Sequence, residues 1–322
     1  MIERSDNSLI RYILAITSLF LFGLVFSNAH ATNGLFSHAY GSRQSGIAGS
    51  GVAFPQDALI IAINPAGVSQ LEENSYEIDL QYFSPRRNYT VKPSAASGNF
   101  PPFPGPEVES GSESFFIPGF GMNRGIGDDA AWGFAIYGNG GMNTDWSASN
   151  TPFGLGTFAG GNVPGAKADA GVDYSQLFAN LSYSRKFGDG NASWGLGAIL
   201  NYSRIELNGV AGFGPFSVDP ANLSDQGYDD AFGYGLKFGL QGDVGRVTLA
   251  ASYQTEIANE FDAYSGLFPE GGKLHIPATA QFGIAADAGP GTITADIQHF
   301  FYSNAEGVGD PGTTGLPTQC MP

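Results

Sequence analysis

The sequence has one cysteine, four histidines and few charged residues. The single cysteine, Cys320, excludes an intrachain disulfide framework and a cysteine-rich metal site. Charged residues make up 14% of the chain, with 14 basic residues against 30 acidic ones. The net charge of −16 opposes binding to the phosphates of nucleic acid. We therefore expect no nucleic-acid partner, no metal and no cofactor.

Motifs for catalysis are also scarce. No serine stands in a Gly-x-Ser-x-Gly nucleophile elbow. The histidines are spread along the chain at His30, His38, His275 and His299 and suggest no catalytic set. We expect a protein that is not an enzyme.

Glycine and aromatic residues, by contrast, are abundant. Glycine accounts for 47 of 322 residues, about twice its ordinary usage, and each glycine inside a helix costs ~1 kcal/mol. A helical bundle is therefore disfavoured. The 25 Phe, 14 Tyr and 3 Trp disfavour a disordered chain, which usually lacks aromatic residues.

The first 31 residues have the layout of a cleavable signal peptide. Arg4 and Arg11 precede an apolar run over residues 12–26, which is followed by the Ala-His-Ala of residues 29–31. The run is short for a membrane-spanning helix, which needs about 20 residues. The pattern predicts an exported protein, with cleavage after Ala31.

Apolar and polar residues alternate with a period of two along most of the remaining chain, which is typical of β-strands. Several segments reach about ten residues, enough for a tilted strand to cross a bilayer. The nine predicted strands are 76–83, 113–122 (interrupted by Pro118 and Gly119), 132–138, 177–184, 193–203, 231–241, 247–254, 278–287 and 292–299.

The two faces of these strands differ in kind. In 193–203, Trp194 and Tyr202 stand at the two ends of the apolar face, as in the aromatic girdles of membrane barrels. The other face is small and polar, which suits a wet or lightly packed lumen. A soluble sandwich has the same period but places its largest residues in mid-core. We expect an all-β transmembrane antiparallel barrel, because a sheet in lipid must close.

The connections between strands alternate in length, and this predicts the orientation. Barrels of the outer membrane have short periplasmic turns and long outer loops, which places the mature N-terminus on the periplasmic side. The short connections include 188–190 and 289–291; the long ones are 91–111, 144–170, 209–227 and 259–275.

Residues 32–74 lack the strand period and are rich in small residues, so we expect a compact plug with short helical turns. The segment carries Asn33-Gly34, a glycine-rich run at Gly46–Gly51, Asp57-Ala58 and Asn64-Pro65-Ala66. With the signal peptide and the barrel period, it resembles the N-terminal hatch of the FadL/TodX family of outer-membrane transporters. The resemblance implies a plugged barrel of about fourteen strands that takes up fatty acids or other hydrophobic compounds.

The resemblance also implies a location, partners and a route. The location is the outer membrane of a Gram-negative bacterium. The partners are hydrophobic small molecules, lipid and lipopolysaccharide, and the barrel-assembly machinery. In this family the third strand is kinked inward and opens the wall sideways beside the Asn-Pro-Ala turn. Here Gly138, Gly140 and Gly141 follow the third predicted strand, and glycine tolerates breaks in pairing. The alternative is a flexible strand end entering a loop.

Two groups of residues are candidates for ligand contact. Phe153, Leu155 and Phe158 lie in one long loop, with Phe213 and Phe216 in the next, and could form an apolar capture groove; ordinary loop packing is the alternative. Lys237 lies on the polar face of its strand and could bind a fatty-acid carboxylate or pair with Asp57. An uncharged hydrocarbon would require no cation.

Nine strands are an odd number for a bacterial single-chain barrel, and residues 319–322 follow without a final amphipathic strand. We therefore expect a C-terminally truncated chain with nine of about fourteen strands. The expected organisation is a signal peptide (1–31), a hatch (32–74) and a partial barrel (75–322). The predicted function is uptake of hydrophobic molecules; the alternatives are a general diffusion porin and a structural or adhesive barrel.

Overall fold

The computed structural model describes residues 33–71, 74–90, 92, 107–146 and 169–309. The chain divides into two units, Met1–Gly34 and Leu35–Pro322. Asn33 and Gly34 are the only described residues of the first unit. The predicted signal peptide lies outside the described residues.

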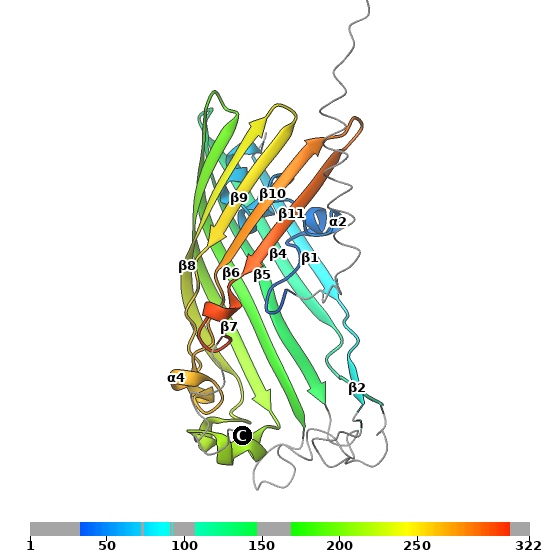
Figure 1. The fold of residues 1–322 in the computed structure, drawn as a ribbon, viewed down its shortest axis with the longest axis vertical. Coiled ribbons are helices and arrows are strands. Elements are labelled where there is room, and N and C mark those ends of the chain that lie inside the picture. Colours follow the sequence, from blue (N-terminus) through cyan, green and yellow to red (C-terminus); the bar gives the residue numbers. More distant parts are fainter. Residues whose placement is uncertain (1–32, 72–73, 91, 93–106, 147–168, 310–322) are drawn as a thin grey trace, which may run out of the picture. The chain divides into compact units, whose positions relative to one another are not determined.

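The second unit is built on a curled antiparallel sheet in which the strands follow chain order (Figure 1). All nine predicted strands are confirmed, and a short two-stranded sheet that we did not predict lies between the first two. The main strands are β1 (Ser75–Phe83), β4 (Phe115–Ile126), β5 (Ala130–Trp146), β6 (Ala170–Phe187), β7 (Ala192–Asn208), β8 (Asp229–Val244), β9 (Val247–Gln254), β10 (Thr279–Asp287) and β11 (Thr292–Phe300); the short pair is β2 (Asn88–Thr90) and β3 (Glu107–Glu109). Within the described ranges, β1 and β11 form the two edges of the sheet.

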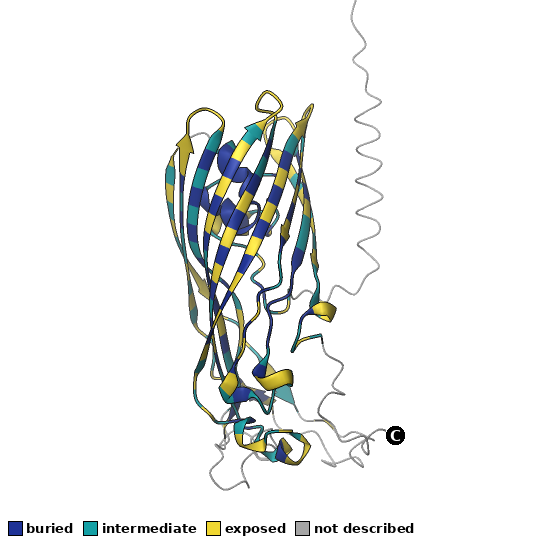
Figure 2. Cartoon of the chain, turned by 90° about the vertical axis from the view of Figure 1, so that its left-hand side faces the viewer, coloured by how far each residue is buried: buried dark blue, intermediate teal, exposed yellow. Residues whose placement is uncertain are grey.

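Burial alternates along the strands (Figure 2), and many large apolar side chains of the strands are exposed. On β8, Tyr234 is 86% exposed and Lys237 is 4% exposed. A soluble sheet would bury its large apolar side chains instead, so this distribution indicates an outer surface that faces lipid. The predicted assignment of residues to faces is confirmed for β7 and β8.

Residues 35–71, which we call the hatch, pack against the concave inner face of the sheet (Figure 1). They form three short helical elements: α2 (Ser42–Gly46), η1 (Ala58–Ala62) and η2 (Pro65–Gln70). Among the described residues, no helix combines the length and hydropathy needed to cross a membrane. The main apolar core lies between hatch and sheet; it includes Val52, Leu59, Ile61 and Val68 of the hatch and Ala135, Tyr137, Phe178 and Ile199 of the sheet.

Two expectations about the early strands need correction. The segment around Pro118 and Gly119 is a continuous part of β4, since both residues pair with β1. β5 does not end at Gly138 but continues to Trp146 in register with β6. Proline is compatible with β4 because only one side of this stretch is paired.

The alternation of short and long connections is confirmed in the described part of the chain. Residues 127–129, 188–191, 245–246 and 288–291 form short turns at one end of the sheet. The long connections 209–228 and 255–278 contain η5 (Ala211–Phe216), η6 (Pro220–Asn222), η7 (Asp262–Tyr264) and α4 (Pro269–Gly272); η8 (Tyr302–Asn304) follows β11.

Candidate functional site

The Asn-Pro-Ala turn joins η1 to η2 at the centre of the hatch. Asn64 is fully buried and is the N-cap of η2: its Oδ1 accepts a hydrogen bond from the Ala66 amide at 3.1 Å. Its Nδ2 donates to the Val52 carbonyl at 2.9 Å. Proline is well suited to the first position of a helix, where no amide donor is needed. The asparagine side chain therefore holds two parts of the hatch together.

Serine hydroxyls on the inner face of the sheet donate hydrogen bonds to this turn. The carbonyl oxygen of Ala66 accepts hydrogen bonds from Ser184 Oγ on β6 and from Ser193 Oγ on β7, each at 2.9 Å. Ser69 Oγ of η2 lies 2.7 Å from Ser184 Oγ. These groups are buried, so neutral hydrogen bonds attach the turn without the cost of burying charge.

Glycines on the inner face of the sheet lie where the hatch approaches most closely. A Cβ on Gly195 would lie 2.3 Å from the Pro65 carbonyl carbon, and one on Gly239 would lie 2.0 Å from Asn64 Oδ1. A Cβ on Gly133 would lie 2.6 Å from Ile61 Cδ1. The small residues of the inner face thus leave room for the hatch. The interior is closely packed where the hatch meets these glycines, so the expected lightly packed lumen is wrong there.

Lys237 lies on the inner face of β8, under the end of η1. Its Nζ donates to the carbonyl oxygen of Ala62, the last residue of η1. Asp57 instead caps the start of η1, accepting from the Leu59 amide at 2.9 Å, and its Oδ2 lies 4.0 Å from Arg43 Nε. The predicted pairing of Lys237 with Asp57 is therefore wrong.

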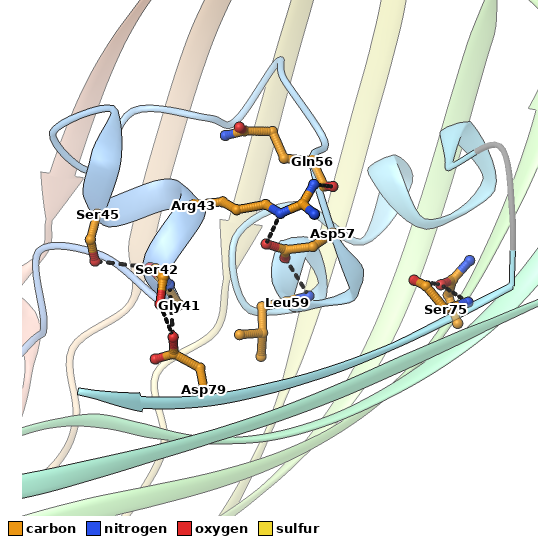
Figure 3. A network of polar contacts seen from close by, with 10 residues as sticks. Gly41, Ser42, Arg43, Ser45, Gln56, Asp57, Leu59, Ser75 and Asp79 are labelled. Atoms are coloured by element: carbon orange, nitrogen blue, oxygen red, sulfur yellow. Dashed lines mark hydrogen bonds and ion pairs between the residues drawn. The ribbon is translucent and has the colours of Figure 1, made fainter.

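The first half of the hatch is held by polar contacts (Figure 3). Ser42 donates through its amide, at 3.0 Å, and through its hydroxyl to Asp79 on β1. Arg43 donates to the Gln56 carbonyl at 2.9 Å. Arg43 and Asp57 are the only Lys, Arg, Asp or Glu residues between 33 and 71. Burial raises the pKa of Asp57, and Arg43 opposes that rise.

The opposite edge of the sheet also binds the hatch. Asp296 Oδ2 on β11 accepts from the amides of Gly51 and Val52 at 2.6 and 3.0 Å. Because Asp79 is on β1, the hatch is attached to both edge strands. A carboxylate that accepts backbone amides in this way makes strong, charge-assisted hydrogen bonds.

The ladder between β4 and β5 ends inside both strands, at the pair Gly119 and Tyr137. Beyond it, residues 115–118 continue to pair with β1, and residues 138–146 continue to pair with β6. We call this divergence the β4–β5 fork. The chains meet again where the Gly111 amide donates to the Asp145 carbonyl at 2.8 Å.

A β-bulge lies at the start of the fork. The register of β5 against β6 shifts between Gly138 and Gly140, which leaves Asn139 without a register partner in β6. A Cβ on Gly138 would lie 2.5 Å from Ile117 Cγ2, and one on Gly141 would lie 2.3 Å from the Tyr174 carbonyl oxygen. The three predicted glycines therefore lie inside a strand, at the point where its pairing with β4 has ended.

Comparison with protein families matches residues 23–297 to a family described as outer membrane protein transport protein (OMPP1/FadL/TodX). The chain belongs to this family. The OMPP1/FadL/TodX proteins are outer-membrane transporters of hydrophobic compounds and not enzymes, and the outer membrane is accordingly the location of this chain. No curated protein sequence gave a significant match.

Solved structures of similar fold come from the same family. The toluene transporter TodX of Pseudomonas putida is 16% identical, with a TM-score of 0.55 over 82% of this chain and 68% of that one. A FadL homologue of Pseudomonas aeruginosa is 18% identical, with a TM-score of 0.56 over 84% and 70%. The toluene transporter TbuX of Ralstonia pickettii is 17% identical, with a TM-score of 0.57 over 83% and 72%. At these identities the likeness shows the fold.

The remaining predicted site residues are placed as follows. Asn33 and Gly34 lie in the first unit, and Phe153, Leu155 and Phe158 lie outside the described residues. Phe213 and Phe216 are about half exposed in η5. Asn139 and the serines at 184 and 193 were not among the predicted site residues. The two-residue period identifies these serines as inward-facing, but it carries no signal of which hatch carbonyl they meet.

Proposed function

We propose that this member of the family takes up hydrophobic molecules, such as aromatic hydrocarbons or long-chain fatty acids, through the plugged sheet. One observation carries the proposal: the β4–β5 ladder ends in mid-strand, directly beside the hatch. Family relatives with described cargo include toluene transporters and a monoaromatic hydrocarbon channel. Burial of apolar ligand surface, ~25 cal/mol per Å², supplies the driving force for capture.

The proposed route begins in the long loops and ends in the membrane. Capture involves Phe213 and Phe216, together with Phe153, Leu155 and Phe158. The ligand then passes along the inner face and leaves sideways at the fork beside Gly138, Gly140 and Gly141. The proposal further includes contact of the outer loops with lipopolysaccharide and insertion by the barrel-assembly machinery.

The proposed role of Lys237 depends on whether the cargo is a fatty acid or an uncharged hydrocarbon. If the cargo is a fatty acid, displacement of η1 would free the Lys237 ammonium from the Ala62 carbonyl and let it bind the carboxylate. We expect Lys237→Met to lower uptake of oleate several-fold and to leave uptake of toluene unchanged. Equal uptake of oleate by both forms would remove Lys237 from the ligand site.

The function is tested in cells that lack this protein and are complemented with the full-length form. We expect complementation to raise the initial rate of uptake of radiolabelled toluene or oleate. Unchanged uptake of both would favour a structural or adhesive barrel. Large, steady ion currents from the purified protein in planar bilayers would favour a porin, because a seated hatch should block them.

The route is tested at the fork. Valine at Gly140 would meet the Leu35 carbonyl oxygen and valine at Gly141 the Tyr174 carbonyl oxygen, so Gly140→Val and Gly141→Val should lower uptake. Gly291→Val is the matched control, because its Cβ has open space. Surface levels are equalised by quantifying the heat-modifiable, folded band on gels. Unchanged uptake at equal surface level would discard the lateral route.

A further inference from the structure

We propose that the outer face of the sheet carries a binding site for the headgroup of an anionic phospholipid, at the end where the short turns lie. The site, which we call the arginine patch, consists of Arg124, Trp132, Tyr183, Arg185 and Trp194. Its occupant is a phosphatidylglycerol-type lipid of the periplasmic leaflet, bound through its phosphate. The inference goes beyond the transport proposed above, because a lipid bound here is a partner of the sheet whatever the cargo is.

The pairing register places the five residues together on the outer face. Arg124 on β4 lies opposite Trp132 on β5, and Trp132 lies opposite Tyr183 on β6. Arg185 of β6 lies opposite Trp194 on β7. Directly opposed side chains on one face have Cβ atoms about 5 Å apart, and the rings of Tyr183 and Trp194 have centroids 5.7 Å apart. The patch is therefore a continuous surface across β4, β5, β6 and β7.

The two arginines flank Trp132. Arg185 lies opposite Ala130 of β5, so two strand spacings and an offset of two residues separate the arginines, which corresponds to about 12 Å between their Cα atoms. Two long side chains can reach one headgroup across this span. A guanidinium group binds a phosphate through two parallel hydrogen bonds, and tryptophan favours the level of the headgroups. The patch thus combines a phosphate site with an interfacial anchor.

The spacing along β6 places the patch at the membrane boundary. From Asp173 to Arg185 the strand advances twelve residues, or about 40 Å. At a tilt of about 40° this length covers about 30 Å of depth, which is the thickness of the hydrocarbon core. The outward-facing residues in between are Ser175, Leu177, Ala179, Leu181 and Tyr183. In outer-membrane barrels the short turns face the periplasm, so the patch contacts the phospholipid leaflet.

Both arginines are exposed, and their charges are left without an ion pair in the part of the chain that the structure describes. The acidic residues nearest to them in sequence, Asp128, Asp129 and Asp189, lie in the turns beyond the strand ends. None of these three forms an ion pair with either arginine within the described ranges. The patch therefore presents positive charge that a bound anion can neutralise.

Arg204, at the other end of the outer face, is in the opposite situation. Its Nε lies 3.6 Å from Asp230 Oδ1, and its guanidinium carbon lies 3.8 Å from the centroid of the Tyr228 ring. The protein itself supplies the partners of this arginine. At the patch, an ethanolamine or choline headgroup would bring a further positive charge beside two arginines, so a headgroup with a net negative charge is favoured.

The tryptophans of the chain report on occupancy of the patch. Two of the three, Trp132 and Trp194, belong to it, whereas Trp146 lies at the other end of β5. The purified protein with Trp146→Phe is reconstituted in phosphatidylcholine vesicles, so that its tryptophan fluorescence comes from the patch. A brominated lipid quenches a ring that it touches. Quenching by brominated phosphatidylglycerol, relative to brominated phosphatidylcholine at the same mole fraction, measures the relative affinity.

We expect stronger quenching by the brominated phosphatidylglycerol, and a preference that falls as salt is added. One arginine near an anionic lipid surface changes the affinity about fivefold. Arg124→Gln and Arg185→Gln should therefore each lower the relative affinity about fivefold, and the double variant should lose the preference. Arg204→Gln, an exposed arginine on the same face, is the matched control and should leave quenching unchanged. The heat-modifiable band on gels establishes that each variant is folded.

Equal quenching by the two brominated lipids would overturn the site, and so would an undiminished preference in the folded double variant. Purified lipopolysaccharide that restores more fluorescence than unlabelled phosphatidylglycerol with the same amount of phosphate would overturn the choice of a periplasmic-leaflet lipid.

Native mass spectrometry of the protein that retains Trp146 makes the same comparison if Trp146→Phe does not fold. Phosphatidylglycerol adducts should outnumber phosphatidylethanolamine adducts and should be lost in the double variant. Equal numbers of both adducts would contradict the proposal. No uptake is measured in these experiments, so their outcome is independent of the function proposed above.

Discussion

The two halves of the hatch are attached to the sheet by different forces. Residues 57–71 are almost entirely buried, with an apolar core around Ile61 and neutral hydrogen bonds to the Ala66 carbonyl. Residues 35–56 contribute Phe36, Val52 and Ala53 to the same core, but they also contain many exposed positions and are attached by carboxylates on the edge strands and by the bulge at Asn139. The second half is therefore held mainly by core packing, and the first half by a smaller share of the core together with polar contacts.

The largest expected effect is in the glycine surface under the second half. Gly195→Val would place side-chain atoms on the Pro65 backbone, and overpacking against backbone should cost more than about 3 kcal/mol. We expect a lower thermal midpoint of the purified protein in detergent, followed by tryptophan fluorescence. Gly291→Val, in open space, should not change it; an equal midpoint for both would refute close packing of the turn.

The apolar core of the second half comes next. Ile61 is fully buried, so Ile61→Ala should lower the free energy of unfolding by about 2–5 kcal/mol. Ile78→Ala is the paired control, because Ile78 is 82% exposed on the outer face. Chemical denaturation in micelles measures the free energy of unfolding of both variants. A larger loss of this free energy in Ile78→Ala than in Ile61→Ala would contradict our assignment of the inner and outer faces of the sheet.

Asn64→Ala tests the cap that joins the two halves. The variant removes the bond to the Ala66 amide and leaves the Val52 carbonyl without this donor. We expect a loss of about 1–2 kcal/mol, measured by the same denaturation. Hydrogen exchange should show weaker protection at the Ala66 amide, and full protection there would contradict the cap.

The ion pair between Arg43 of the first half and Asp57 of the second half should contribute least among these interactions. Arg43 is 59% exposed in its side chain and lies 4.0 Å from Asp57, and such pairs contribute about 0.2–1 kcal/mol. Arg43→Gln should therefore cost less than 1 kcal/mol, and high salt should reduce the difference. A loss as large as that of Ile61→Ala would contradict this ranking of ion pair below core packing.

The last prediction concerns how the contribution of Asp57 to stability changes with pH. Burial raises its pKa in the folded protein above the ordinary 3.8, so the folded state binds the proton more readily than the unfolded state. Its contribution to stability is greatest at low pH and falls as pH rises through the folded pKa. Asp57→Asn keeps a capping side chain and should gain stability relative to wild type as the pH rises above the ordinary pKa of 3.8. A gain that instead grows on acidification would contradict this sign.

The candidate site could be predicted from sequence only in part. The segment Asn64-Pro65-Ala66 has the residues of a helix start, and it forms one. The glycines at 138–141 indicate disturbed pairing, but a bulge inside a longer strand and a strand that ends there have the same local sequence. Lys237 could be assigned to the inner face, but its partner could not be identified. The Ala62 carbonyl is a backbone atom, which no residue type reveals.

The sequence alone determined the nine strands and which side chains face outward, because a two-residue period is a local property of an extended chain. It also determined that residues 35–71 would not be strand. Only the tertiary structure decided that Ser184 and Ser193 hold Ala66, that β4 and β5 part at Tyr137, and that Asn139 binds Ser37 and Tyr40. Those contacts join residues about a hundred positions apart, and they depend on register and hatch position, which the local pattern does not encode.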